Sequence, residues 1–245
     1  MFIKFGSKEH LSSLMGSGEM FFNPCEYFRN LEDEERKKGI GDANDGGICS
    51  KFENALVVDT AKNCYTLSGQ SLSVITAPSL HTPIFCLRKT EQKHISFEYR
   101  KKLRDQFPSH THALVIEDEH SFLESIRFSF HNKAFAHKIF YQDDWYIDYI
   151  EFIRSGSSDI FFYPTKNHRN SYYMALNYIS HNGEKTILTI DNSNFYKTMF
   201  CKSLFFKDQE EYRIVLPYEQ ISSGEKYYIE PLDSYLCTID DLVFG

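Results

Sequence analysis

The chain has 245 residues, a net charge of −7 and an apolar content of 42%, which suits one large globular domain or two small ones. The acidic balance gives no global basic field that would hold a nucleic acid. No apolar run approaches the ~20 residues of a membrane span, and the N-terminus lacks a signal-peptide pattern. We therefore expect a soluble, cytoplasmic protein without a membrane partner.

The N-terminal region predicts a strand, a helix and a second strand. Residues 2–5 are extended in character, and Ser7 is a suitable N-cap for a helix over 8–15 that Gly16 and Gly18 would end. Residues 20–22 then predict another short strand, and the Pro24 that follows starts a turn or helix. Because 22 Phe and 16 Tyr pack well on pleated surfaces, strands should dominate the fold.

The segment 39–47 contains four Gly, two Asp and one Asn, so we predict a loop. Its backbone amides could cradle a phosphate, although it matches neither the dinucleotide fingerprint nor the Walker pattern. The charges of Asp42 and Asp45 repel phosphate and would better suit a ribose hydroxyl or a cation. A plain surface loop is the alternative.

The rest of the chain alternates further strands with short helices. This pattern predicts a single α+β domain over 1–245, mainly antiparallel sheet with short helices. Residues 155–195 read as an insertion. The expected strands are 54–59, 72–76, 84–88, 112–116, 136–141 and 186–190, and the expected helices are 32–38, 98–105, one capped by Asp118, and 167–180, with a loop between Pro78 and Pro83.

Six Cys residues, at positions 25, 49, 64, 86, 201 and 237, lack a Cys-x-x-Cys spacing. We expect all six to be reduced, as in a cytosolic protein. His110 and His112 would share a strand face, but no third ligand is evident nearby, so we predict no metal site.

The segment 205–216 places Gln209, Glu210 and Glu211 directly before a strand-like run. Alternation puts Glu211, Arg213 and Val215 on one face of that strand. A carboxylate against an apolar strand needs a partner or a function, because burying it alone is costly. Two interpretations stay open: an ion pair of Glu211 with Arg213 or Lys207, or a functional carboxylate.

The motif Gln-x-Glu-Tyr-Arg-Ile resembles the C-terminal signature of a broad group of uncharacterised bacterial and phage proteins. The segments 2–6, 11–18, 21–28 and 39–46 resemble the start of the same group, whose usual form at 39–46 is closer to Arg-Gly-Asp-x-x-Glu-Gly. More distantly, the order of parts is similar to that of ADP-ribosyltransferases, including DarT-like toxins. In that comparison Lys4 stands where many of these enzymes have His or Arg. The resemblance also implies that 2–5 and 211–216, which are both apolar on one face, share a sheet.

This resemblance implies an NAD-dependent ADP-ribosyltransferase that breaks the nicotinamide–ribose bond and transfers ADP-ribose to a target. Glu211 would stabilise the cationic transition state and Gln209 would orient the acceptor or ribose. The implied NAD contacts are Lys4, Tyr27, Phe28, Asp42 and Arg213.

The implied biology is a toxin or anti-phage effector that acts on an unknown macromolecular target and has an antitoxin or defence-system partner. The alternative is a non-catalytic binding or interaction module in which Glu211 and Arg213 form a structural ion pair.

Overall fold

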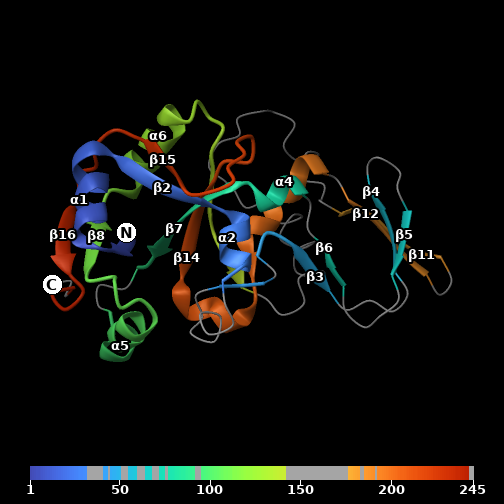
Figure 1. Ribbon diagram of the computed structural model, residues 1–245, viewed down its shortest axis with the longest axis horizontal. Helices are drawn as coiled ribbons and strands as arrows, with labels where there is room; N and C mark the ends of the chain where they lie inside the picture. Colours follow the sequence, from blue (N-terminus) through green and yellow to red (C-terminus); the bar gives the residue numbers. More distant parts are fainter. Residues whose placement is uncertain are drawn as a thin grey trace.

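The computed structural model describes residues 1–31, 41–43, 45–50, 55–59, 64–67, 72–74, 77–91, 95–141, 176–182, 185–190 and 192–242. The fold is α+β, with a mainly antiparallel sheet and short helices, as the sequence predicts (Figure 1). None of the helices in these ranges combines the length and the apolar character that crossing a membrane requires.

The N-terminal elements form where the capping residues place them. Strand β1 (Phe2–Gly6) leads into helix α1 (Lys8–Ser17), and strand β2 (Glu19–Pro24) follows. The Ser7 side chain accepts a hydrogen bond from the backbone N–H of His10, which caps the helix start. Gly18 ends the helix with φ 68°, a left-handed conformation that glycine adopts at low cost.

The other helices have at most 11 residues each. They are α2 (Cys25–Arg29), α4 (Ala77–Leu80), α5 (Phe97–Gln106), α6 (Glu119–Ser129) and the 3-10 helices η1 (Asn192–Phe200) and η2 (Leu204–Gln209). The other strands are β3 (Ile48–Ser50), β4 (Ala55–Asp59), β5 (Cys64–Leu67), β6 (Leu72–Val74), β7 (Pro83–Lys89), β8 (His112–Ile116), β9 (Phe135–Lys138), β10 (Phe140–Tyr141), β11 (Leu176–Asn182), β12 (Lys185–Ile190), β13 (Cys201–Lys202), β14 (Glu211–Val215), β15 (Glu225–Tyr228) and β16 (Tyr235–Thr238).

Strand β7 is the centre of the main sheet, whose order is β15-β2-β7-β1-β8-β16; in addition, β14 pairs with β7, and β9 pairs with β14. Arg88 of β7 pairs with Glu211 of β14 on one edge and with Ile3 of β1 on the other. Ile84 pairs in the same way with β14 and β2. Strands β1 and β2 therefore share one edge of β7, and β14 occupies the other edge. The prediction that 2–5 and 211–216 share a sheet is confirmed.

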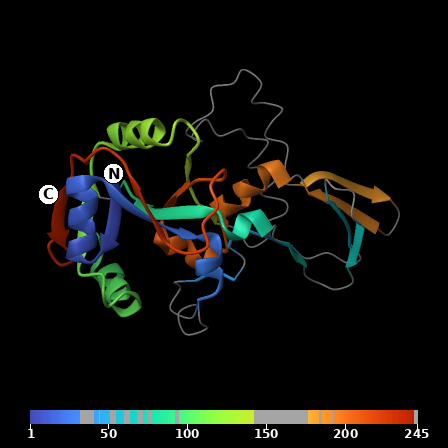
Figure 2. The same cartoon turned by 45° about the horizontal axis from the view of Figure 1, so that its top comes forward.

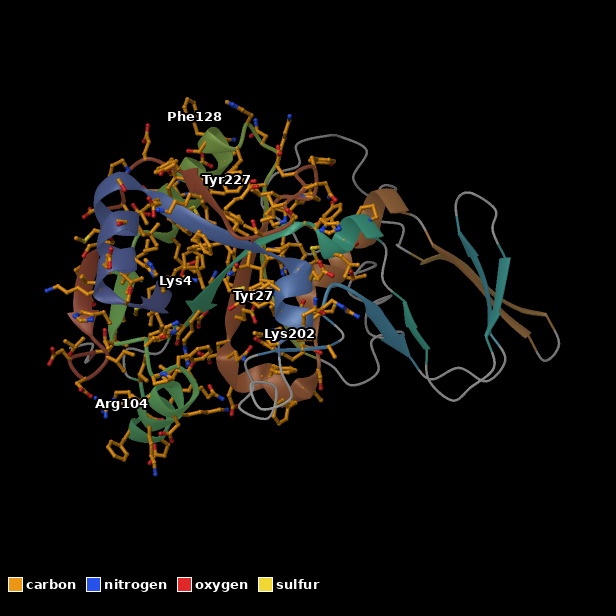
Figure 3. All side chains as sticks on the ribbon, viewed as in Figure 1. Lys4, Tyr27, Arg104, Phe128, Lys202 and Tyr227 are labelled. Atoms are coloured by element: carbon orange, nitrogen blue, oxygen red, sulfur yellow. The ribbon has the colours of Figure 1, made fainter. Side chains whose placement is uncertain are left out.

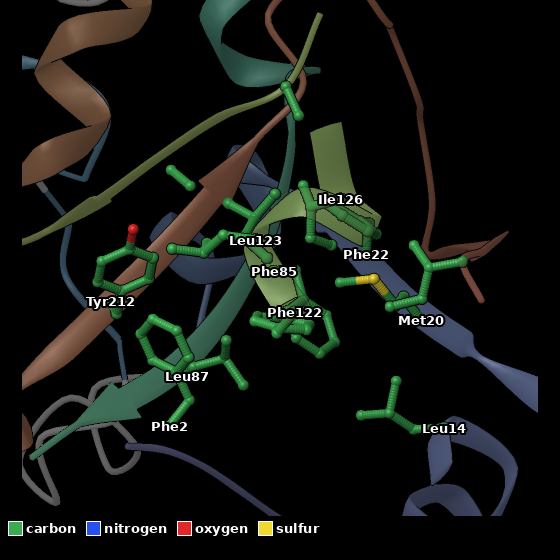
Figure 4. Packing of buried hydrophobic residues seen from close by; sticks show 14 of the residues in the cluster. Phe2, Leu14, Met20, Phe22, Phe85, Leu87, Phe122, Leu123, Ile126 and Tyr212 are labelled. Atoms are coloured by element: carbon green, nitrogen blue, oxygen red, sulfur yellow. The ribbon is translucent and has the colours of Figure 1, made fainter. Parts of the chain in front are cut away.

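The two faces of this sheet bury different clusters. One face packs against α1 and α6 through a large cluster that includes Phe2, Phe85 and Tyr212 (Figure 4). The opposite face carries two smaller clusters, one beside α2 and η1 and one beside α5. In Figure 2, α6 lies above the sheet, and α5 and α2 lie below it. Arg88 of β7 and Glu211 and Arg213 of β14 lie on the same face as Ile84 and Val215, which belong to one of the two smaller clusters.

A second sheet has the order β11-β12-β4-β5 and lies at the far end of the molecule from β8 and β16 (Figure 1). The helix predicted over 167–180 is wrong for 176–180, which belongs to β11. The reason is tertiary: β11 pairs with β12, whose other edge pairs in parallel with β4. These cross-strand partners override a local helical spacing.

Two smaller differences concern strand ends. The strand predicted over 136–141 is divided at Ile139, because β9 pairs with β14 whereas β10 pairs in parallel with β13. The loop predicted between Pro78 and Pro83 contains part of α4. The helix expected at 32–38 lies outside the described residues, as does 155–175 of the expected insertion.

Candidate functional site

Arg213 is the centre of a buried network of charges on β14, and its side chain is 0% exposed. Its Nη1 and Nη2 donate to Asp45 Oδ1 and Oδ2 at 2.5 and 2.6 Å, which is a bidentate pair. Its Nε donates to Glu211 Oε1 at 2.5 Å, and Nη1 also reaches the carbonyl of Met199. Burial alone would lower the pKa of Arg213, but Asp45 and Glu211 hold it well above its ordinary value. The guanidinium is therefore permanently charged and fully engaged.

Both carboxylate oxygens of Glu211 have cationic partners. Oε1 accepts from Arg213, and Oε2 accepts from Lys202 Nζ at 2.7 Å. The parallel pairing of β10 with β13 places Lys202 opposite Tyr141, whose hydroxyl accepts the Glu211 backbone N–H at 2.8 Å. Burial raises the pKa of Glu211, but Arg213 and Lys202 outweigh it and hold the pKa well below its ordinary range. Glu211 is ionised, 7% exposed and paired on both sides.

The loop that contains Asp45 is fastened to this network through its backbone. Arg29 Nη1 donates to the Asp45 carbonyl at 2.7 Å, and the Cys25 thiol donates to the same oxygen at 3.4 Å. Thr198 Oγ1 donates to the Gly46 carbonyl. Both oxygens of the Asp45 carboxylate, which the sequence suggests would suit a ribose hydroxyl or a cation, accept hydrogen bonds from Arg213.

Gln209 and Glu211 converge on one ammonium group, although the backbone between them is not extended. Gln209 ends η2, and Lys202 Nζ donates to its Oε1 at 3.2 Å as well as to Glu211. Glu210 adopts a left-handed conformation, with φ 44°, and its carboxylate accepts from Arg88 Nη2. The cation that pairs with Glu211 beside Arg213 is therefore Lys202 and not the Lys207 considered from the sequence.

Lys4 lies on the same sheet but joins a different contact. Its ammonium donates to the carbonyl of Cys86 at 2.7 Å and lies 4.3 Å from the centroid of the Phe85 ring. Burial lowers the pKa of Lys4, and the nearby Cys86 and Glu211 oppose that shift. The Cys86 carbonyl lies on β7 between the residues that pair with β1 and those that pair with β2, and the Lys4 side chain supplies its hydrogen bond. In Figure 3, Lys4 on β1 and Lys202 lie on opposite sides of β7.

The aromatic residues proposed to stack on nicotinamide lie on α2. Tyr27 is exposed, and Phe28 packs against the cluster that contains Val215. Their rings meet edge to face at 5.3 Å. Helix α2 contacts the loop of the charged network at Asp45, by way of Cys25 and Arg29. Asp42, in the same loop, is buried, and its carbonyl accepts the Asp45 N–H.

Sequence reasoning missed Lys202, Tyr141 and Arg88 as members of this region. Arg88 carried a signal, because it is a charged residue inside the apolar run of β7, on the face that alternation shares with Cys86 and Ile84. Lys202 and Tyr141 had none, since their positions depend on a two-residue parallel pairing between distant segments.

The network can neutralise and orient charge, but its central groups are already engaged with one another. Three cationic side chains, Arg213, Lys202 and Arg88, face the carboxylates of Asp45, Glu211 and Glu210. Among the described residues, no group of His, Cys, Asp and Glu is arranged to hold a metal ion. No protein-family model, curated protein or solved structure matches this chain.

Proposed function

We propose that this chain is a non-catalytic binding module in which Glu211, Arg213 and Asp45 form a structural network. One observation carries the proposal: each oxygen of the Glu211 carboxylate is ion-paired, to Arg213 at 2.5 Å and to Lys202 at 2.7 Å. A carboxylate that stabilises a cationic ribose directs its negative charge at the ribose, whereas the charge of Glu211 is directed at two cations of the protein itself. Here the positive charge that Glu211 would meet in a transition state is already supplied by the protein.

The cost of breaking this network supports a structural role. Removing one partner of a buried ion pair leaves an uncompensated charge and costs about 3–5 kcal/mol. Asp45 and Arg213 are separated by 168 residues and Glu211 lies beside them, so the network joins the N-terminal loop to the last part of the sheet. Its loss would therefore release contacts on both segments.

The test is Glu211→Gln, measured for thermal melting and for NAD cleavage. We expect the variant to lose about 3–5 kcal/mol, and each kcal/mol corresponds to about 2–4 °C of melting temperature at this chain length. We expect no release of nicotinamide by the wild type. Glu124→Gln is the control, because Glu124 pairs with Arg127 on the surface at 2.9 Å, where the change costs at most about 1 kcal/mol.

The stability lost in Glu211→Gln should also depend on pH. Because the folded pKa of Glu211 lies below its ordinary value of 4.5, its ion pairs stabilise the protein above pH 4.5 and are lost as the pH falls. The stability difference between wild type and Glu211→Gln should therefore shrink in acid. A difference that stays constant from about pH 7 to about pH 3 would contradict the structural role.

The second candidate is NAD-dependent ADP-ribosyl transfer by a toxin-like or anti-phage effector. The observation that favours it is the convergence of Gln209 and Glu211 on one ammonium group, that of Lys202. In this candidate Gln209 would orient the acceptor, and Lys202 would have to release Glu211 when NAD binds. Nicotinamide release by the wild type, abolished in a Glu211→Gln protein with an unchanged melt, would replace the first proposal with this one.

A further inference from the structure

Arg88 is buried, yet its guanidinium is only partly used. The side chain is 9% exposed, and Nη2 donates to Glu210 Oε2 at 2.5 Å. Within the described residues, neither Nε nor Nη1 has the geometry of a hydrogen bond, although Arg88 lies close enough to the Tyr99 side chain to oppose the rise that burial causes in the pKa of Tyr99. Buried donors without partners are rare in folded proteins and call for an explanation. In Arg88 two of the three nitrogens are in this state.

The surroundings hold the guanidinium in a fixed orientation. Its Cζ lies 3.8 Å from the centroid of the Tyr99 ring of α5, which is a stacked arrangement. Arg88 pairs with Glu211 across β7 and β14, but the carboxylate of Glu211 already binds Arg213 and Lys202. The charge of Arg88 is therefore opposed mainly by Glu210.

Glu210 has the properties of a replaceable partner. Its side chain is 38% exposed, so it can turn into solvent. Its backbone is left-handed, which is unfavourable for a residue with a Cβ, and such strained positions often lie at functional sites. A guanidinium offers two bidentate forks, Nε–Nη2 and Nη1–Nη2, and Glu210 occupies the nitrogen that both forks contain.

We propose that Arg88 binds a phosphate group of a ligand and that Glu210 is an internal carboxylate which the phosphate displaces. When Glu210 turns away, Nη2 together with Nε or Nη1 forms a fork that fits two phosphate oxygens. A ligand carboxylate would only equal the tethered carboxylate of Glu210, whereas a phosphate brings more charge and more acceptor oxygens. This inference names the ligand class of the proposed binding module and rests on that function.

The test measures binding of inorganic pyrophosphate by calorimetry at low ionic strength. Arg88→Gln should weaken binding about tenfold or more, because it removes charge-assisted hydrogen bonds. Glu210→Gln should strengthen binding by up to about fivefold, because it removes an exposed competitor. Changes in opposite directions from the two partners of one ion pair are the expected signature. Equal effects, or wild-type affinity in Arg88→Gln, would overturn the proposal.

Asp208→Asn is the matched control for Glu210→Gln. It removes one negative charge two residues away, from a carboxylate that is exposed and bound to Lys102 at 3.1 Å. Its affinity should stay within about twofold of wild type, since screening weakens exposed charges. If Asp208→Asn strengthens binding as much as Glu210→Gln does, pyrophosphate responds only to general surface charge and the proposal fails.

A second Arg88 variant and a second ligand complete the test. If Arg88→Gln does not fold, Arg88→Lys keeps the charge but loses the fork, and it should still weaken binding severalfold. Comparing pyrophosphate with ADP separates a free phosphate ligand from a nucleotide, since a nucleotide site should bind ADP more tightly. Nicotinamide release from NAD tests the proposed function separately, so the two proposals can fail independently.

Discussion

At the residue scale, Arg213 and Arg88 each have a carboxylate partner from a distant part of the chain. Arg213 binds Asp45, and Arg88 binds Glu210 across a separation of 122 residues. Buried ion pairs are weak sources of net stability but are strongly destabilising when one member is removed. The network therefore sets which arrangement of the segments is allowed more than how stable the protein is.

Asp45→Asn tests this interpretation at the most buried pair. Asp45 and Arg213 are both 0% exposed, so the variant leaves a buried guanidinium without its main counter-charge and should lose about 3–5 kcal/mol. Chemical denaturation followed by circular dichroism measures this change. The surface control is Lys102→Gln, which breaks only the exposed pair with Asp208 and should cost at most about 1 kcal/mol. Equal losses in the two variants would show that burial does not distinguish them.

At the element scale, the loop that carries Asp45 must pass very close to α2. Gly46 has φ +64°, and a Cβ there would lie 2.4 Å from Cys25 Sγ. Glycine provides both the left-handed conformation and the space. The loop predicted over 39–47 is thus not a loose surface segment in its described part, because its backbone is packed against buried side chains.

Gly46→Ala and Gly16→Ala form a matched pair at this scale. Gly46→Ala should destabilise the protein by more than about 1 kcal/mol, from the left-handed backbone alone, with the clash added. Gly16 lies in α1, and a Cβ at this position would meet no atom within 4 Å, so Gly16→Ala should stabilise by about 0.5–1 kcal/mol. Urea unfolding of the two variants should move in opposite directions; a shared direction would contradict the assignment of Gly46 to a close packing contact.

At the scale of the whole molecule, the thiols whose side chains the structure describes form no disulfide. Cys25, Cys86, Cys201 and Cys237 are free, while the side chains of Cys49 and Cys64 lie outside the described part. Burial raises the pKa of the Cys86 thiol to about 12, with Glu211 adding to the shift. This thiol stays protonated and unreactive at neutral pH.

We expect all six cysteines to be reduced in the purified protein. Intact mass spectrometry without reductant should give the mass of the fully reduced chain. Alkylation under denaturing conditions should then add six groups, one for each Cys in the sequence. A mass lower by two hydrogens, or fewer alkylated sites than cysteines, would reveal a disulfide and contradict the prediction.

Helix ends and strand faces could be predicted from the sequence where they depend on interactions between residues close together in the chain. Ser7 and Gly18 bound α1, Asp118 caps α6, and alternation assigned the two faces of β14. Each depends on interactions within a few residues, such as a cap hydrogen bond or the period of two in a strand. Glu211 and Arg213 are two residues apart, so this pair could also be considered from the sequence.

Only the tertiary structure decided which charges meet. Strand pairings bring Lys202 and Arg88 to β14, and a packed loop brings Asp45 there. No spacing in the sequence predicts these contacts. The same holds for β11, where pairing with β12 replaced the helix that its local spacing favoured. The long-range partners of a strand are those that allow the whole sheet to be buried. Leaving a buried charge unpaired in that sheet would cost more free energy than the local secondary-structure preferences contribute.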